Sequence, residues 1–136
     1  MKSLNIPVEV TQPPTGMTEA VLSELAEHLK NLIDNDTSYV IDVNSLPLSD
    51  IDIAQLEHRL GKGEVEVNLN TIGESHIFET AYNGIWWVKH YTPEKVLISQ
   101  FIEITTIPHI IKSQPEDSKL ALSRLLANLT VNNIDQ

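Results

Sequence analysis

The chain has 136 residues, which is the size of a single domain. Nineteen acidic and nine basic residues give a net charge of −10, which argues against nucleic acid and anionic membrane surfaces as partners, because both are bound largely through Lys and Arg. The chain has no cysteine, so disulfides, thiolate metal sites and cysteine nucleophiles are excluded.

Residues 1–17 are expected to form an N-terminal arm, because they contain three prolines and a glycine and only a short apolar run. The segment lacks the apolar region of a secretory signal. No window of the chain approaches the roughly 18 uninterrupted apolar residues of a membrane span. Together with the absence of cysteine, this favours a cytoplasmic protein. Residues 18–136 are expected to form one domain.

Two helices are expected in the first half of that domain. The first runs from its cap Thr18 to about Asn35, with an apolar stripe formed by Leu22, Leu25, Leu29 and Leu32. Residues 38–43 are β-branched and aromatic, which favours a strand or an extended segment. The second helix begins at Ser49, has two aspartates in its positive first turn and ends at Gly61, which supplies a left-handed stop.

From Gly63 the apolar pattern changes from helical to alternating, which predicts β-strands. Residues 92–95 form a tight turn, 109–113 a short helix or turn, and Pro115 begins a last helix whose apolar face consists of Leu122, Leu125, Leu126 and Leu129. The four expected strands are 65–69, 75–82, 85–91 and 96–105. The predicted fold class is α+β: a four-stranded antiparallel β-meander packed with about three α-helices.

Asn83-Gly84 predicts a two-residue hairpin turn, because both residues accept the positive φ angles of a type I′ turn. Tyr82 would then pair with Ile85 and Thr80 with Trp87. Because side chains alternate across a strand, the two indoles point to opposite faces of the sheet. The Trp87 face also carries Phe78, Thr80, Ile85, Ile98 and Ile102.

The other face carries Ile77, Ala81, Trp86, Val88 and Phe101, with Glu79 and His90 as diagonal neighbours within reach of one another. Both faces are largely apolar. Either the N-terminal and C-terminal helices cover one face each, or one face stays partly open for self-association or partner binding. The sequence leaves these alternatives open.

No catalytic, cofactor or metal site is expected. The five histidines are scattered without metal-ligand spacing. Glu79 and His90 could meet on the hairpin, but His76 falls on the opposite face, and no nucleophile or oxyanion donor is identifiable beside the pair. The run 61–63 leads from helix into strand, the reverse of a phosphate-binding loop, and is better explained as a helix stop and a tight strand entry.

Four segments, in order and at the right spacing, resemble the C-terminal conserved region of the HupH/HyaF family of hydrogenase expression/formation proteins. They are VIDVNSLPLSDID (40–52), LGKGEVEV (60–67), ET-A-NG-IWWV (79–88, with Tyr82 variable) and FIEITTIPHII (101–111). The similarity covers about residues 38–112. Longer family members resemble two such regions in tandem, whereas this chain holds one, so a homodimer could stand in for the tandem pair.

The resemblance implies a non-enzymatic, chaperone-like accessory factor in the maturation of nickel–iron hydrogenase, which binds a hydrogenase subunit or another maturation factor in the cytoplasm. The family offers no catalytic residues to carry over. The preferred partner-binding residues follow from the open-face interpretation, because aromatic anchors carry much of the energy of interfaces: Glu79, Trp86, Val88, His90 and Phe101. Two alternatives to the accessory role remain open: a homo-oligomeric structural or regulatory domain unrelated to hydrogenase, and a small enzyme using Glu79 and His90.

Overall fold

The computed structural model describes residues 15–134 of the chain, with side chains described to residue 131. The chain divides into two compact units, residues 1–106 and 107–136. Of the expected N-terminal arm, residues 1–14 lie outside the described residues.

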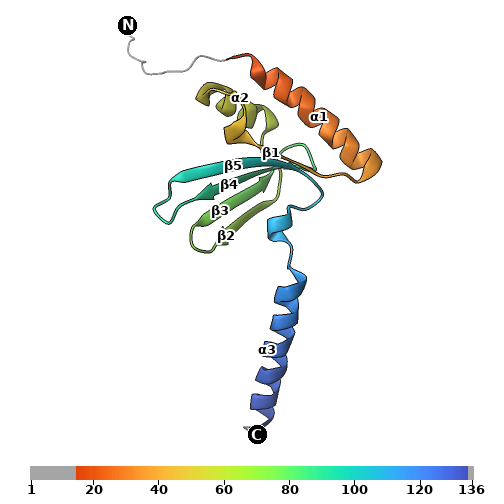
Figure 1. Ribbon diagram of the computed structural model, residues 1–136, viewed down its shortest axis with the longest axis vertical. Coiled ribbons are helices and arrows are strands. Elements are labelled where there is room, and N and C mark those ends of the chain that lie inside the picture. Colours follow the sequence, from red (N-terminus) through yellow and green to blue (C-terminus); the bar gives the residue numbers. More distant parts are fainter. Residues whose placement is uncertain (1–14, 135–136) are drawn as a thin grey trace. The chain divides into compact units, whose positions relative to one another are not determined.

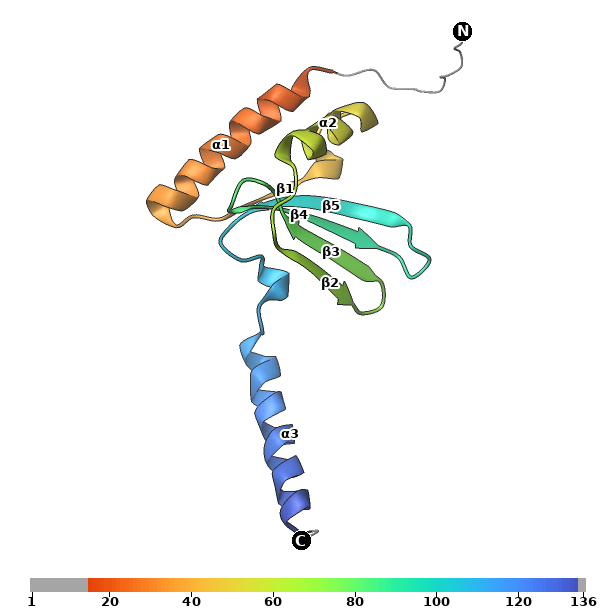
Figure 2. The same cartoon turned by 180° about the vertical axis from the view of Figure 1, so that it is seen from behind.

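The first unit is a five-stranded antiparallel sheet with two α-helices on the same side of it (Figures 1 and 2). The strand order is β1-β5-β4-β3-β2. Its elements are α1 (Met17–Asn35), β1 (Tyr39–Asp42), η3 (Val43–Ser45), α2 (Asp50–Leu60), β2 (Glu66–Asn70), β3 (Glu74–Glu79), β4 (Ile85–Tyr91) and β5 (Leu97–Ile104). The second unit contains a 3-10 turn, η4 (His109–Ile111), and a helix, α3 (Pro115–Ile134).

The predicted α+β class and the antiparallel meander of β2 to β5 are confirmed, but the sheet has five strands and not four. The additional strand is β1, which lies antiparallel to β5 with Tyr39 opposite Ile104 and Ile41 opposite Ile102. The β-branched residues of this segment predicted its extended conformation. Its pairing with β5 could not be predicted, because more than fifty residues separate the two strands in the sequence.

The main core lies between the two helices and the Trp87 face of the sheet. Trp87 is completely buried and donates from Nε1 to Oε1 of the buried Gln100 at 3.0 Å. Lys89 on β4 donates to both carboxylate oxygens of Glu57 on α2, at 2.9 and 3.1 Å, which fastens the helix to the sheet. The other apolar side chains of this core are Val21, Leu25, Ile41, Val43, Leu56, Leu60, Phe78, Ile85, Ile102 and Ile104.

The start of α1 differs from the prediction. Gly16, with φ of 83°, precedes the helix, and Thr18 is the second helical residue and not the cap. The Thr18 side chain is buried, and its hydroxyl donates to the Asp52 carbonyl at 3.4 Å. Thr18 therefore contributes to the contact between the two helices.

Asp52 is a buried carboxylate that connects α2 to the residue before α1. It accepts hydrogen bonds from the backbone N–H of Ser49 (3.1 Å) and from the hydroxyl (2.5 Å) and N–H (3.1 Å) of Thr15. Ser49 caps α2 in return by accepting from the Asp52 N–H, which completes a capping box. The hydrogen bond from the Thr15 hydroxyl is the main reason why the pKa of Asp52 lies below its usual value. Burial acts in the opposite direction and raises this pKa, whereas the hydrogen bonds from Ser49 lower it further.

This carboxylate gives a pH-dependent prediction. Because the pKa of Asp52 is lower in the folded state than its unfolded value of about 3.9, its contribution is complete above that value and is lost as the pH falls through the folded-state pKa. Asp52→Asn is therefore expected to lower the urea midpoint more at pH 7 than at acidic pH. Equal losses at both pH values would contradict this, and Asp50→Asn, an exposed neighbour in the same helical turn, is the matched control.

The β3–β4 connection also differs from the prediction. It is a four-residue loop, 81–84, closed by Thr80 and Ile85, and not a two-residue turn: the Thr80 N–H donates to the Ile85 carbonyl at 2.9 Å. Gly84 has a positive φ of 97°, but Asn83 does not, so no type I′ turn forms. Phe78 consequently lies opposite Trp87, and Glu79 opposite Trp86. The shift is two residues, so the side chains within β3 and β4 stay on their predicted faces, and the opposite orientation of the two indoles is confirmed.

Candidate protein-binding site

Parts of three of the four sequence segments that carry the family resemblance meet at one end of the sheet, around the 81–84 loop: residues 60–63, 79–86 and 105. The Glu79 carboxylate accepts from the Gly84 N–H at 3.0 Å, and the Gly84 carbonyl accepts from the Thr105 N–H at 2.9 Å. The Trp86 Nε1 donates to the Thr105 carbonyl at 3.1 Å. These bonds join β3, β4 and the end of β5, so the segment residues hold the loop in place.

The run Leu60–Gly63 fixes the same loop from the side of α2. Gly61 ends the helix with φ of 67°, and the Leu60 carbonyl accepts from the Ala81 N–H at 2.9 Å. Gly63 donates to the Glu79 carbonyl at 2.7 Å. A Cβ atom on Gly63 would lie only 2.6 Å from the Thr80 carbonyl oxygen. Glycine is needed here because two backbone segments approach closely.

The structure brings the five predicted partner-binding residues together on one face of β3, β4 and β5. Glu79 lies opposite Trp86, and Val88 opposite Phe101. The His90 ring packs edge-to-face against Phe101 with centroids 5.8 Å apart. We call this group the β-face patch: Glu79, Trp86, Val88, His90 and Phe101. No helix of residues 15–106 lies over this side of the sheet, since α1 and α2 are both on the other side (Figures 1 and 2).

Exposure within the β-face patch is uneven. Trp86 is only 5% exposed and Val88 only 1%, whereas Glu79, His90 and Phe101 are half-buried. Trp86 was expected to be an open aromatic anchor, and its burial differs from that expectation. Its Nε1 is engaged by the Thr105 carbonyl. The accessible part of the patch therefore consists of Phe101 and the two polar residues.

Glu79 and His90 do not meet, which corrects the expected diagonal contact. His90 lies opposite Ser75, whose hydroxyl is 2.7 Å from the His90 Nδ1. Glu79 is four positions along β3 from Ser75, a spacing of about 13 Å along a strand. The two-residue register shift is the cause, and the pair cannot act as an acid–base couple. No group of three or more His, Cys, Asp or Glu side chains that could hold a metal ion occurs among residues 15–131.

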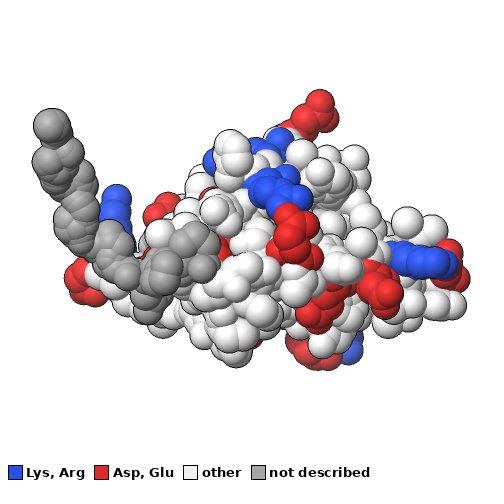
Figure 3. Space-filling model, turned by 90° about the horizontal axis from the view of Figure 1, so that it is seen from above, with Lys and Arg blue, Asp and Glu red and all other residues white. Residues whose placement is uncertain are grey.

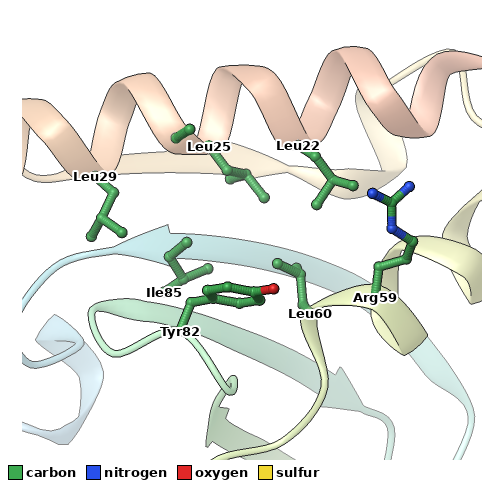
Figure 4. Close-up of a pocket in the computed structure, with 8 residues that line it drawn as sticks. Leu22, Leu25, Leu29, Arg59, Leu60, Tyr82 and Ile85 are labelled. Carbon is green, nitrogen blue, oxygen red and sulfur yellow. The ribbon is translucent and has the colours of Figure 1, made fainter.

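An apolar groove on the helical side of the sheet was not predicted (Figure 4). Its volume is about 260 Å³. Leu22, Leu25 and Leu29 project into it from α1 toward Tyr82 and Ile85, and Arg59 stands at one end (Figure 4). The sequence contained one sign of it, the leucine stripe of α1, but only the folded loop brings the half-exposed Tyr82 to the opposite wall.

Charge does not locate a binding site on the side that carries α1 and α2. In Figure 3 acidic and basic residues are interspersed among uncharged ones on this side. Among the described residues, Arg59 pairs with Glu19, Lys30 with Asp34 and Lys62 with Glu66. These pairs neutralise charge locally and leave the net charge of −10 unchanged.

The second unit presents a different apolar surface. Four leucines of α3 form the stripe predicted from the sequence, and each is more than half exposed: Leu122, Leu125, Leu126 and Leu129.

No helix among the described residues 15–134 is long and apolar enough to cross a membrane.

Known proteins are similar to this chain in sequence and in fold. A solved structure, the hydrogenase expression protein HupH from Thiobacillus denitrificans ATCC 25259, superposes with a TM-score of 0.82 and 35% identity over 87% of this chain and 98% of that chain. The hydrogenase expression/formation protein HupQ of Azotobacter chroococcum mcd 1 is 35% identical over 107 residues, or 77% of this chain and 38% of the relative. HoxQ of Azotobacter vinelandii, with the same description, is 32% identical over 116 residues, or 82% and 41%.

The chain spans about two fifths of the length of these curated relatives. Residues 17–131 match the family described as HupH hydrogenase expression protein, C-terminal conserved region. This match extends the resemblance of residues 38–112 in both directions and includes α1 and most of α3. The chain therefore belongs to the HupH family of hydrogenase expression proteins, through that family's C-terminal conserved region.

Proposed function

We propose that the chain is a non-enzymatic accessory factor of nickel–iron hydrogenase maturation that acts in the cytoplasm and binds a hydrogenase subunit or another maturation factor. The observation that carries the proposal is the family match over residues 17–131, because the relatives are named for hydrogenase expression and formation. The geometry is in keeping with it: the shared segments build a rigid loop and sheet, and apolar surface remains beside them.

We place the partner on the accessible part of the β-face patch. Phe101 and His90 form a half-buried aromatic pair over a buried apolar floor that includes Ile77 and Val88. A partner side chain that packs on this pair would bury it completely, and aromatic residues in such positions commonly dominate the binding energy. Glu79 lies at the edge of the patch with one carboxylate oxygen bonded to the Gly84 N–H.

Phe101→Ser is expected to weaken partner binding by about 2 kcal/mol or more, or about 30-fold, because the accessible part of the ring that contacts the partner is removed. Tyr82→Ser is the matched control, since Tyr82 is a half-exposed aromatic residue of the apolar groove on the other side of the sheet. The measurement is capture of the hydrogenase subunits and maturation factors by the immobilised chain from hydrogenase-producing cells, quantified by mass spectrometry.

Each outcome has a separate meaning. Loss of capture with Phe101→Ser alone supports the β-face patch. Loss with Tyr82→Ser alone moves the binding site to the groove while leaving the accessory role intact. Failure of the unaltered chain to capture any hydrogenase subunit or maturation factor contradicts the proposed function itself.

A further inference from the structure

Within the second unit, the leucine stripe of α3 is continuous and exposed. Leu122, Leu125, Leu126 and Leu129 are between 51% and 59% exposed. At 100° per residue they fall within about 100° of the helix circumference, the width of a face that is normally buried in a globular protein. Most helical stability in proteins comes from packing such a face, and isolated helices are marginal in water. α3 therefore requires a surface that covers its stripe.

The spacing of the stripe is symmetric about a point between Leu125 and Leu126. The pattern Leu-x-x-Leu-Leu-x-x-Leu reads the same in both directions. In an antiparallel pair of α3 helices related by a two-fold axis at that point, Leu122 lies opposite Leu129 of the second copy, and Leu125 opposite Leu126. A two-fold interface joins a patch to itself, and this stripe is self-complementary in that arrangement.

Charge also favours a second copy at this helix. The chain as a whole has a net charge of −10, so two copies repel one another over most of their surface. In α3, two acidic residues, Glu116 and Asp117, are balanced by two basic residues, Lys119 and Arg124. α3 is thus a neutral part of an acidic chain, where close approach of two copies is opposed least.

We propose that two copies of this chain associate through an antiparallel pairing of their α3 helices, centred between Leu125 and Leu126. The pairing buries eight leucines in four layers across the two-fold axis. A 20-residue helix is about 30 Å long, so the contact is small beside most stable interfaces, and the dimer dissociates on dilution. The proposal is independent of the hydrogenase role, because it requires no other protein.

Sedimentation equilibrium of the purified full chain over a range of concentrations tests the pairing. The apparent mass is expected to rise from 15.2 kDa toward twice that value. The double variant Leu125→Gln/Leu126→Gln keeps good helix formers and is expected to weaken association more than about 100-fold, because four buried leucines per dimer are replaced. The control Leu120→Gln/Val131→Gln changes two equally exposed apolar residues of α3 on the side opposite the stripe and is expected to leave association unchanged.

A mass of 15.2 kDa at every concentration would overturn the proposal, as would a dimer that survives Leu125→Gln/Leu126→Gln. The register has its own test, because the natural chain has no cysteine. A mixture of Leu122→Cys and Leu129→Cys chains is expected to form the mixed disulfide under mild oxidation. Efficient disulfide formation by Leu122→Cys alone would indicate a parallel pair and contradict the antiparallel register, since residue 122 lies about 10 Å along the axis from its own symmetry mate in the proposed pair.

Discussion

Trp87→Ala will lower the free energy of unfolding by about 3–5 kcal/mol, the usual cost of truncating a large buried aromatic residue. Trp87 is the largest fully buried side chain of the core. Its removal leaves a cavity in the main core and also leaves the buried Gln100 without the indole donor. Urea unfolding followed by far-ultraviolet circular dichroism is the measurement, because loss of a tryptophan alters fluorescence directly.

Trp87→Phe is the matched variant, since it retains most of the ring volume and loses the hydrogen bond to Gln100. Its loss of stability is expected to be smaller than that of Trp87→Ala. A loss within the range of surface substitutions for Trp87→Ala, about 0.5 kcal/mol, would show that the residue does not form the centre of the core.

Gly63→Val will lower the free energy of unfolding by about 1–3 kcal/mol, as inserted atoms do in a closely packed site. The new Cβ would lie 2.6 Å from the Thr80 carbonyl oxygen and 3.2 Å from that of Glu79. Both neighbours are backbone atoms, so relief requires moving the end of α2 away from β3. The hydrogen bond from Gly63 to Glu79 would be stretched in the process.

Glu64→Val is the control for this substitution, because the adjacent Glu64 is exposed and receives the same side chain. Both variants are compared by urea midpoint. Equal midpoints would mean that the close approach at Gly63 is relaxed in solution and that the glycine has no steric role.

Elements defined by local chemistry were predictable from the sequence. Ser49 and Gly61 set the two ends of α2 through a capping box and a glycine with positive φ, although the ψ of −166° at Gly61 is not that of the expected left-handed stop. Both ends depend on residues within a few positions. The first residue of α3 follows from Pro115 in the same way. Face assignments in the sheet were also predictable, because they depend only on parity, and parity survives a shift of two residues.

Features defined by distant contacts were not predictable. The 81–84 loop is held by the Leu60 carbonyl on α2 and by Thr105 at the end of β5, and these contacts override the local preference of Asn83-Gly84. That loop conformation separates Glu79 from His90 and closes the groove with Tyr82. The pairing of β1 with β5 depends in the same way on the completed fold.

The most direct test of the proposed role is deletion of the coding sequence in a hydrogenase-producing host. Hydrogenase activity is measured per amount of hydrogenase subunit and compared after complementation with the unaltered chain and with the Phe101→Ser variant. An accessory role predicts lower specific activity after deletion, full recovery with the unaltered chain and reduced recovery with the variant, whose folding is verified by its urea midpoint. Unchanged hydrogenase activity in the deletion strain would contradict the proposed role.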